Sequence, residues 1–165
     1  MLPTTPRYRV DCIRQTAWGA DMSAYKHIML AVDFSNATEI LVQRALTLRQ
    51  FCGADLSLVH VIEPVIIDPS YDVFPAMPLG LEQEVADRAQ QELERLAARL
   101  GVATERCHVV VGSTKNEILR CAGEHAADLI VVGSHGRHGV ALLLGSTANA
   151  VLHGAPCDVL AVRIK

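Results

Sequence analysis

The sequence lacks any apolar run long enough to cross a membrane. Its apolar segments, such as residues 129–132 and 140–144, fall far short of the roughly 18 to 20 residues that a transmembrane helix needs. The first 21 residues contain three arginines, but neither a continuous apolar segment nor the small-residue cleavage site of a secretory signal. We therefore expect a cytoplasmic protein without a membrane-spanning segment.

No stretch of the chain is strongly basic. The 165 residues include 15 Lys and Arg against 18 Asp and Glu, which gives a net charge of −3 at pH 7. Proteins that bind nucleic acids through the phosphate backbone carry clusters of positive charge. The composition therefore argues against a nucleic acid as the main partner.

The five cysteines are odd in number and show no C-x-x-C spacing, unlike a disulfide framework or a zinc knuckle, so buried reduced thiols are expected. Among the seven histidines, His135 and His138 lie three residues apart in a glycine-rich segment, with no cysteine or carboxylate nearby in sequence. His27 and His60 fall within apolar segments and are expected to be sheet residues with one hydrogen-bonded ring nitrogen each. We predict no resident metal site.

What the sequence does contain is an ordinary globular composition. Half of the residues are apolar and a fifth are charged. A chain of 165 residues is also about the size of one domain. We place this domain at residues 22–165, because Met22 is a natural start, and we interpret residues 1–21 as an N-terminal extension or a misassigned start.

Short β-branched apolar segments alternate with longer segments of helical periodicity from residue 25 onward. The predicted strands cover residues 27–32, 56–62, 107–111, 128–132 and 158–164. One helix should open at residues 33–36 and run to about residue 50, and others should cover 81–100, 116–126 and 146–153. Helical crossovers join parallel strands with right-handed connections. The pattern therefore predicts a single α/β domain with an open, doubly wound five-stranded parallel sheet and helices on both faces.

Two details of the helices follow from the same pattern. Ser35 or Asn36 should cap the first helix through its short polar side chain. The spacing of apolar residues predicts that Ile40 of the first helix and Val85 of the second lie on the buried faces.

Glycines and small polar residues follow the fourth predicted strand. Ligands of doubly wound sheets bind beside the carboxyl ends of the strands, where the strand order reverses. Gly133 and Gly136 would let the backbone approach a ligand closely, and a helix opening at Gly145 with Ser146 and Thr147 offers N–H groups and hydroxyls to an anion such as a nucleoside triphosphate. The alternative is that the glycines only form a tight turn and that a hydroxyl only caps the helix.

Asp33 directly follows the first predicted strand. A carboxylate there can accept a hydrogen bond from a ribose hydroxyl or an adenine amino group, or help to hold Mg²⁺. It could equally be a turn residue that accepts from neighbouring backbone N–H groups. Neither the Rossmann glycine fingerprint nor the Walker A motif occurs, and we interpret residues 112–115 (GSTK) as a strand-to-helix turn with a cap.

The segments YKHI (25–28), AVDFS (31–35), HVI (60–62) and the glycine segment 133–147 resemble, in this order, the universal stress protein family. The resemblance covers residues 22–165 and implies a Rossmann-like fold of the adenine nucleotide α-hydrolase type. Nucleotide-binding members carry G-x2-G-x9-G-[ST], whereas this chain has Gly133-x2-Gly136-x8-Gly145-Ser146, one residue shorter. The family also has a branch that lacks these glycines and does not bind nucleotide.

The resemblance further implies roles for individual residues. The residues that would surround adenine and ribose are Ala31, Asp33, Val61, Val132 and Gly133. The residues that would hold the phosphates are Gly136, Arg137, Gly145, Ser146 and Thr147, with Mg²⁺ possible at Asp33 through Mg-ATP. It also implies a homodimer that pairs the last strand of each subunit, because residues 158–164 form an apolar edge that would otherwise invite aggregation.

Three hypotheses for the function follow. The first is an ATP-binding regulatory protein of the stress response, in which nucleotide occupancy changes the surface that partner proteins meet. The second is a homodimeric scaffold in the same response that binds no nucleotide. The third is a weak ATPase with Mg²⁺ at Asp33 and phosphate at Ser146, which we rank last because no general base or water-positioning residue is recognisable.

Overall fold

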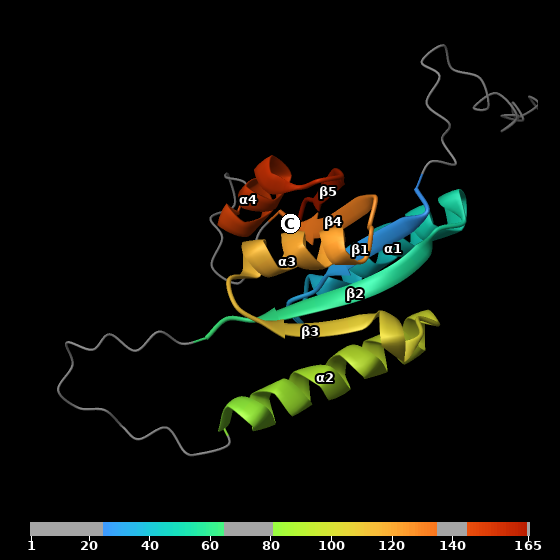
Figure 1. Cartoon of the computed structure of the whole chain (residues 1–165). Helices are drawn as coiled ribbons and strands as arrows, with labels where there is room; N and C mark the ends of the chain where they lie inside the picture. The colour runs from blue at the N-terminus through green and yellow to red at the C-terminus, as the bar shows by residue number, and fades with distance from the viewer. Residues whose placement is uncertain (1–24, 65–80, 135–144, 165) are drawn as a thin grey trace, which may run out of the picture.

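Five strands and four α-helices alternate along the described part of the chain, residues 25–64, 81–134 and 145–164 of this computed structural model (Figure 1). The elements are β1 (His27–Ala31), α1 (Thr38–Cys52), β2 (Asp55–Ile62), α2 (Leu81–Leu100), the short 3-10 helix η2 (Thr104–Arg106), β3 (Cys107–Val111), α3 (Thr114–Glu124), β4 (Leu129–Gly133), α4 (Ser146–Gly154) and β5 (Asp158–Val162). The predicted extension at 1–21 lies outside the described residues, as do the loop at 65–80, Gly136 and Arg137.

All neighbouring strands are parallel, in the order β3-β2-β1-β4-β5. The chain builds outward from β1 to β3 and then returns to place β4 on the other side of β1. This reversal is the switch point of a doubly wound sheet, and its ligand edge lies beside the carboxyl ends of β1 and β4. The predicted fold class is confirmed.

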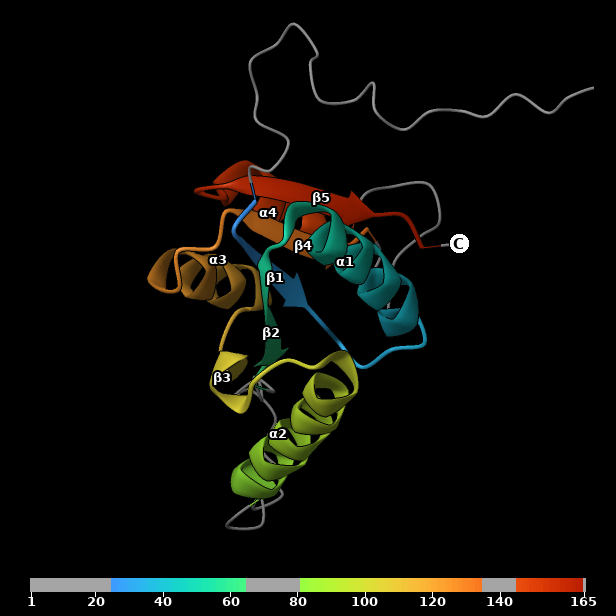
Figure 2. The same cartoon turned by 90° about the vertical axis from the view of Figure 1, so that its right-hand side faces the viewer.

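Helices cover both faces of the sheet (Figure 2), and an apolar layer lies beneath them on each face. Helices α1 and α2 pack on the face that carries Ile28, Leu30 and Leu58, while α3 and α4 pack on the face that carries Met29 and Ile130. Successive residues of a strand point to opposite faces, so strands covered on both sides are continuously apolar. This explains why the sequence pattern located β1 and β4 to within one residue at either end.

Two predicted buried residues are exposed. Ile40 of α1 is 41% exposed and Val85 of α2 is 43% exposed. By contrast, Val42 of α1 and Ala97 of α2 are buried. Apolar residues on α1 and α2 cover more than one stripe, so periodicity alone could not choose the face. The way in which each helix packs on the sheet decides which of its residues are buried.

Helix α1 begins later than predicted. Its N-cap residue is Ala37, which makes no side-chain cap hydrogen bond, so the prediction of Ser35 or Asn36 as the cap was wrong. The Ser35 carbonyl instead accepts a hydrogen bond from the Thr38 N–H at 3.0 Å, and its hydroxyl accepts one from the Ala37 N–H at 3.3 Å. The turn after β1 thus uses the residues that were expected to start the helix.

Within the described ranges, no helix combines the length and the hydropathy needed to cross a bilayer. Among the cysteines described there, Cys121 is buried, and Cys52, Cys107 and Cys157 are partly buried. The expected burial therefore holds fully for Cys121 alone among these cysteines, and their reduced state stays a prediction.

Candidate functional site

The turn after β1 holds Asp33 at the carboxyl edge of the sheet. The Val32 N–H donates to the Val59 carbonyl at 2.9 Å, so the strand stays in the sheet up to the residue before Asp33. One oxygen of the Asp33 carboxylate accepts a hydrogen bond from the Ser35 N–H at 3.0 Å. This is the bond that the turn alternative predicted for Asp33.

Phe34 and His60 support the same turn. Phe34 has φ of 55°, a left-handed conformation that costs free energy for a bulky side chain. Its ring packs on the ring of His60, with centroids 4.3 Å apart. The His60 Nδ1 lies 2.8 Å from the Val32 carbonyl oxygen, which can only accept, so Nδ1 carries a proton. His60 therefore has the hydrogen-bonded ring nitrogen expected of it.

Ser134 connects the end of β4 to the start of α4. Its N–H donates to the Val162 carbonyl at 2.8 Å, and its carbonyl accepts from the Gly145 N–H at 2.6 Å. Its buried hydroxyl accepts from the Ile164 N–H at 3.3 Å. Although residues 135–144 lie outside the described residues, the chain on either side of them is joined at this point. The first turn of α4 therefore lies beside the carboxyl end of β4.

The first turn of α4 offers backbone donors. Its N-cap is Gly145, which has no side chain to cap it, and the first helical bond is the Asn149 N–H to the Gly145 carbonyl at 2.9 Å. Within the described part of the chain, the N–H groups of Ser146, Thr147 and Ala148 have no acceptor. Such groups and the helix dipole favour an anion at this end. Neither hydroxyl caps the helix, so the capping alternative does not describe this turn.

Three of the predicted adenine-site residues belong to one apolar cluster. Ala31, Val61 and Val132 contribute to the layer under α3 and α4. Val132 is only 3% exposed, so it can offer a ligand only its backbone. Gly133 follows as the last residue of β4 and pairs with Val162 of β5. Gly136 and Arg137 lie outside the described residues, so the structure says nothing of them.

Sequence reasoning missed the role of Glu63, which follows β2. One oxygen of its carboxylate accepts hydrogen bonds from the Thr114 N–H at 3.1 Å and from the Thr114 hydroxyl at 2.5 Å. These bonds lower the pKa of Glu63 below its usual value, and the bond from the Thr114 hydroxyl contributes most. Residues 112–115 do form the predicted strand-to-helix turn, but the cap of α3 comes from Glu63. The signal in the sequence is weak, because the partners lie 51 residues apart.

No group of three or more His, Cys, Asp or Glu side chains converges within the described residues in a way that could hold a metal ion. Any Mg²⁺ at Asp33 would therefore need ligands beyond these side chains, such as the phosphate oxygens of a bound nucleotide.

Comparison with known proteins agrees with the fold and with the resemblance noted in the sequence. A sequence model of the universal stress protein family matches residues 24–163. The chain is 42% identical over 147 residues to universal stress protein A homolog 2 of Coxiella burnetii, covering 87% of this chain and 99% of that protein. UspA of Lactobacillus plantarum shares the fold with a TM-score of 0.69 at 24% identity, over 84% of this chain and 98% of that one. A universal stress protein crystallised in complex with cAMP matches with a TM-score of 0.58 at 23% identity, over 84% and 97% of the two chains.

Proposed function

The chain belongs to the universal stress protein family, and from this premise we propose that it binds ATP at the carboxyl edge of β1 and β4 and acts as a cytoplasmic regulatory protein in a stress response. In this proposal nucleotide occupancy changes the surface around the glycine segment, and partner proteins read that change. The protein is proposed to act by binding and not as an enzyme.

The observation that carries the proposal is the position of the first turn of α4. The hydrogen bond from Gly145 to Ser134 fixes this turn beside β4, and no described residue accepts from the N–H groups of Ser146, Thr147 and Ala148. Strands β1 and β4 are neighbours in the sheet, so Asp33 follows the adjoining strand end. An anion-binding helix start and a carboxylate thus belong to the same edge, which suits the phosphates and the ribose of one nucleotide.

The roles of the remaining residues follow from their types and places. Ala31 and Val61 would contact the apolar adenine ring, and Val132 and Gly133 would contribute backbone groups. Gly145, Ser146 and Thr147 would bind phosphate oxygens, together with Gly136 and Arg137. Bound ATP would bring Mg²⁺, for which the Asp33 carboxylate is a suitable oxygen ligand.

The nucleotide class has support from a protein of the same fold. A universal stress protein crystallised in complex with cAMP shows that this fold can hold an adenine nucleotide. The adenosine moiety is common to cAMP and ATP. A helix start with several donors offers more to a triphosphate than to a single cyclic phosphate, and this is our reason for proposing ATP.

Equilibrium dialysis of the nucleotide-stripped protein tests the proposal. Mg-ATP should bind saturably in the micromolar range and more tightly than cAMP or GTP, and no phosphate should be released above the uncatalysed rate. Phosphate release that falls in Asp33→Ala would instead support the ATPase hypothesis. Absence of binding by every nucleotide would contradict the proposal and favour the scaffold that binds no nucleotide.

A further inference from the structure

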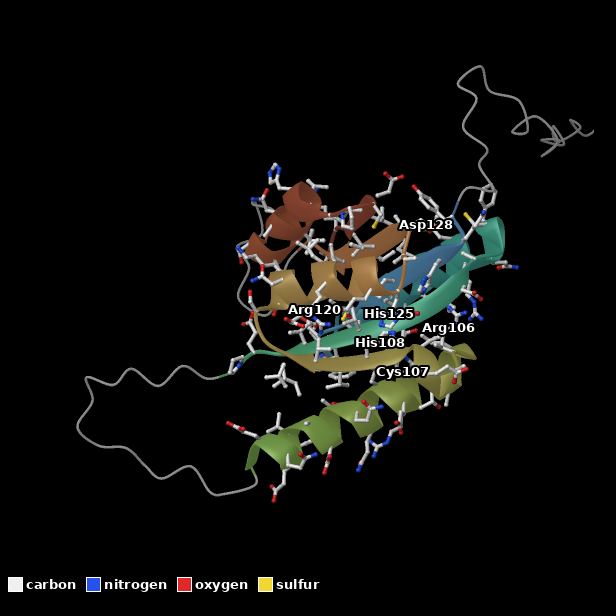
Figure 3. The ribbon with its side chains drawn as sticks, viewed as in Figure 1. Arg106, Cys107, His108, Arg120, His125 and Asp128 are labelled. Atoms are coloured by element: carbon white, nitrogen blue, oxygen red, sulfur yellow. The ribbon has the colours of Figure 1, made fainter. Side chains whose placement is uncertain are left out.

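Three histidines gather at the amino-terminal edge of the sheet, at the opposite end of the strands from the proposed nucleotide site. His27 begins β1. His108 lies in β3 and His125 is the C-cap residue of α3 (Figure 3). Together with Ser57 of β2 they line a cleft of about 470 Å³. This cleft lies outside the carboxyl edge and plays no part in the function proposed above.

The cluster occupies the end of the apolar layer under α3. Side chains two residues apart on a strand share a face. His27 therefore shares the face of Met29, and Ser57 that of Val59, both of which are buried beneath α3 and α4. Apolar residues could have continued this layer to the edge of the sheet, but polar, titratable side chains end it.

His27 ties the end of α3 to the sheet. Its Nδ1 lies 2.8 Å from the His125 carbonyl oxygen, and its Nε2 lies 2.7 Å from the Ser57 hydroxyl, so both ring nitrogens are bonded and not one as expected. The carbonyl can only accept, which assigns a proton to Nδ1, and in the neutral ring Nε2 accepts from Ser57. Ser57 is only 1% exposed, so this bond satisfies an otherwise buried hydroxyl.

His108 and His125 join the end of α3 to β3. Their rings are stacked with centroids 4.0 Å apart and an interplanar angle of 20°. Figure 3 shows the two side chains meeting between β3 and α3. Neutral rings pack well in this geometry. Two protonated rings at this distance repel each other, and this repulsion grows where water is partly excluded.

The charged groups on the surrounding elements do little to offset that repulsion. Those lining the same cleft are Lys26, Asp55, Glu105 and Arg106, and those close by in sequence to its α3 wall are Arg120, Glu124 and Asp128. Most of these acids are already bonded. Asp55 pairs with Arg106 at 2.8 Å and Glu124 with Arg120 at 2.6 Å. Asp128 accepts the N–H groups of Lys26 and His27 at 2.7 and 3.0 Å.

We propose that the stacked pair of His108 and His125, backed by His27 and Ser57, is an acid-sensitive latch that holds the carboxyl-terminal end of α3 on the sheet at neutral pH and releases it when the cluster takes up protons. The other end of α3 is bound to Glu63 at the carboxyl edge. Helix α3 thus connects the latch to the edge where the nucleotide is proposed to bind. Through this connection the protein responds to a fall in pH.

The direction of the pH effect follows from His108. Burial lowers the pKa of His108 below its ordinary value, and the charges of His125 and His27 lower it further. A histidine with a lowered pKa in the folded state stabilises that state fully above its unfolded pKa of about 6.5, and this contribution is lost as the pH falls through the folded pKa. The latch therefore closes near neutrality and opens in mild acid.

Hydrogen exchange of the full chain tests the latch. Protection factors of the amides at residues 121–127 should fall between pH 7 and pH 5, by about tenfold for each unit that separates the closed and open pKa values of His108. Amides of β1 should lose less protection over the same range. His125→Phe keeps an aromatic ring in the stack but cannot take up a proton, so the repulsion between the two rings is absent and its protection factors should vary less with pH than those of the unaltered chain.

His153→Phe is the matched control, because His153 is exposed in the last turn of α4 and lies outside the cleft. It should behave like the unaltered chain. The proposal is overturned if residues 121–127 keep their protection at pH 5, or if His125→Phe loses protection as the unaltered chain does. A ring titration by NMR decides the matter without any variant, since His108 titrating near its ordinary pKa as an isolated ring would also overturn it.

Discussion

Phe34 holds a backbone conformation that bulky residues rarely adopt, directly beside Asp33 at the carboxyl edge. Its φ of 55° persists because neighbouring contacts fix it: the ring packs on His60, and the His60 ring is bonded to the Val32 carbonyl. Strain of this kind, held in place by its surroundings, is frequent at binding sites. At the scale of residues, contacts within the chain itself hold the turn that presents Asp33.

Replacing Phe34 by Ala and by Gly separates the two contributions. Both variants lose the ring contact with His60, but only glycine adopts the left-handed conformation at little cost. Phe34→Ala should therefore be less stable than Phe34→Gly by about 1 kcal/mol, as measured by urea unfolding. Equal stability of the two variants, or a more stable alanine variant, would show that the left-handed turn is not maintained in solution.

At the scale of elements, the sequence located the strands well and the contacts between elements poorly. Strands β1 and β4 are covered on both faces and read as continuous apolar segments, so their positions follow from composition alone. The exposure of Ile40 and Val85 depends on how α1 and α2 lie on the sheet, which periodicity does not contain. The late start of α1 has a similar cause, because a turn held by Phe34 and His60 takes up the residues that precede it.

The candidate site likewise contains residues that the sequence could predict and contacts that it could not. Asp33, Gly145 and Ser146 could be proposed from their places after strands or at a helix start, and the structure finds them at the carboxyl edge. Their binding of ATP stays a prediction. The Glu63 cap and the bond from His27 to His125 join residues that are 51 and 98 positions apart, so no local pattern reveals them.

Glu63 makes a testable contribution to the docking of α3. Glu63→Ala removes the acceptor for the Thr114 N–H and should cost about 1 kcal/mol of unfolding free energy, the usual value of a helix cap. The pKa of Glu63 is lowered by these bonds, so its contribution is present above the usual pKa and is lost as the pH falls through the lowered one. The difference between the two proteins should be full at pH 7 and shrink below about pH 4, since Glu titrates near there.

Chemical unfolding at several pH values measures this difference. Glu82→Ala is a suitable control, because Glu82 is an exposed acid in the first turn of α2. A Glu63→Ala variant as stable as the unaltered chain at pH 7, or a difference that grows in acid, would contradict the assignment.

At the scale of the whole molecule, β5 leaves an edge of the sheet open among the described residues. The apolar side chains of Leu152, Val159 and Leu160 line a cleft of about 490 Å³ beside it. Leu152 is 48% exposed. Apolar edge strands are usually covered, and symmetric pairing with a second copy is one way to do so. We therefore keep the homodimer through β5 as a proposal.

Leu152→Asp tests this pairing. A charge placed in an apolar interface should weaken the dimer by about tenfold or more, which light scattering coupled to size exclusion detects over a range of concentrations. Val85→Asp provides the control, since Val85 is similarly exposed but lies on α2. A monomer in the unaltered chain, or a dimer that Leu152→Asp leaves intact, would reject β5 as the interface.

Calorimetric titration with Gly145→Val is the sharpest test of whether the first turn of α4 receives the phosphates of ATP. Gly145 has φ of −55° and ψ of 150°, which any residue can adopt, so valine adds bulk at the phosphate position without backbone strain. Gly123→Val adds the same bulk in α3, where a side chain would meet open space. We predict micromolar Mg-ATP binding by the stripped protein and by Gly123→Val, and its loss in Gly145→Val. Equal binding by all three proteins, or heat from none of them, would contradict a phosphate site at the first turn of α4.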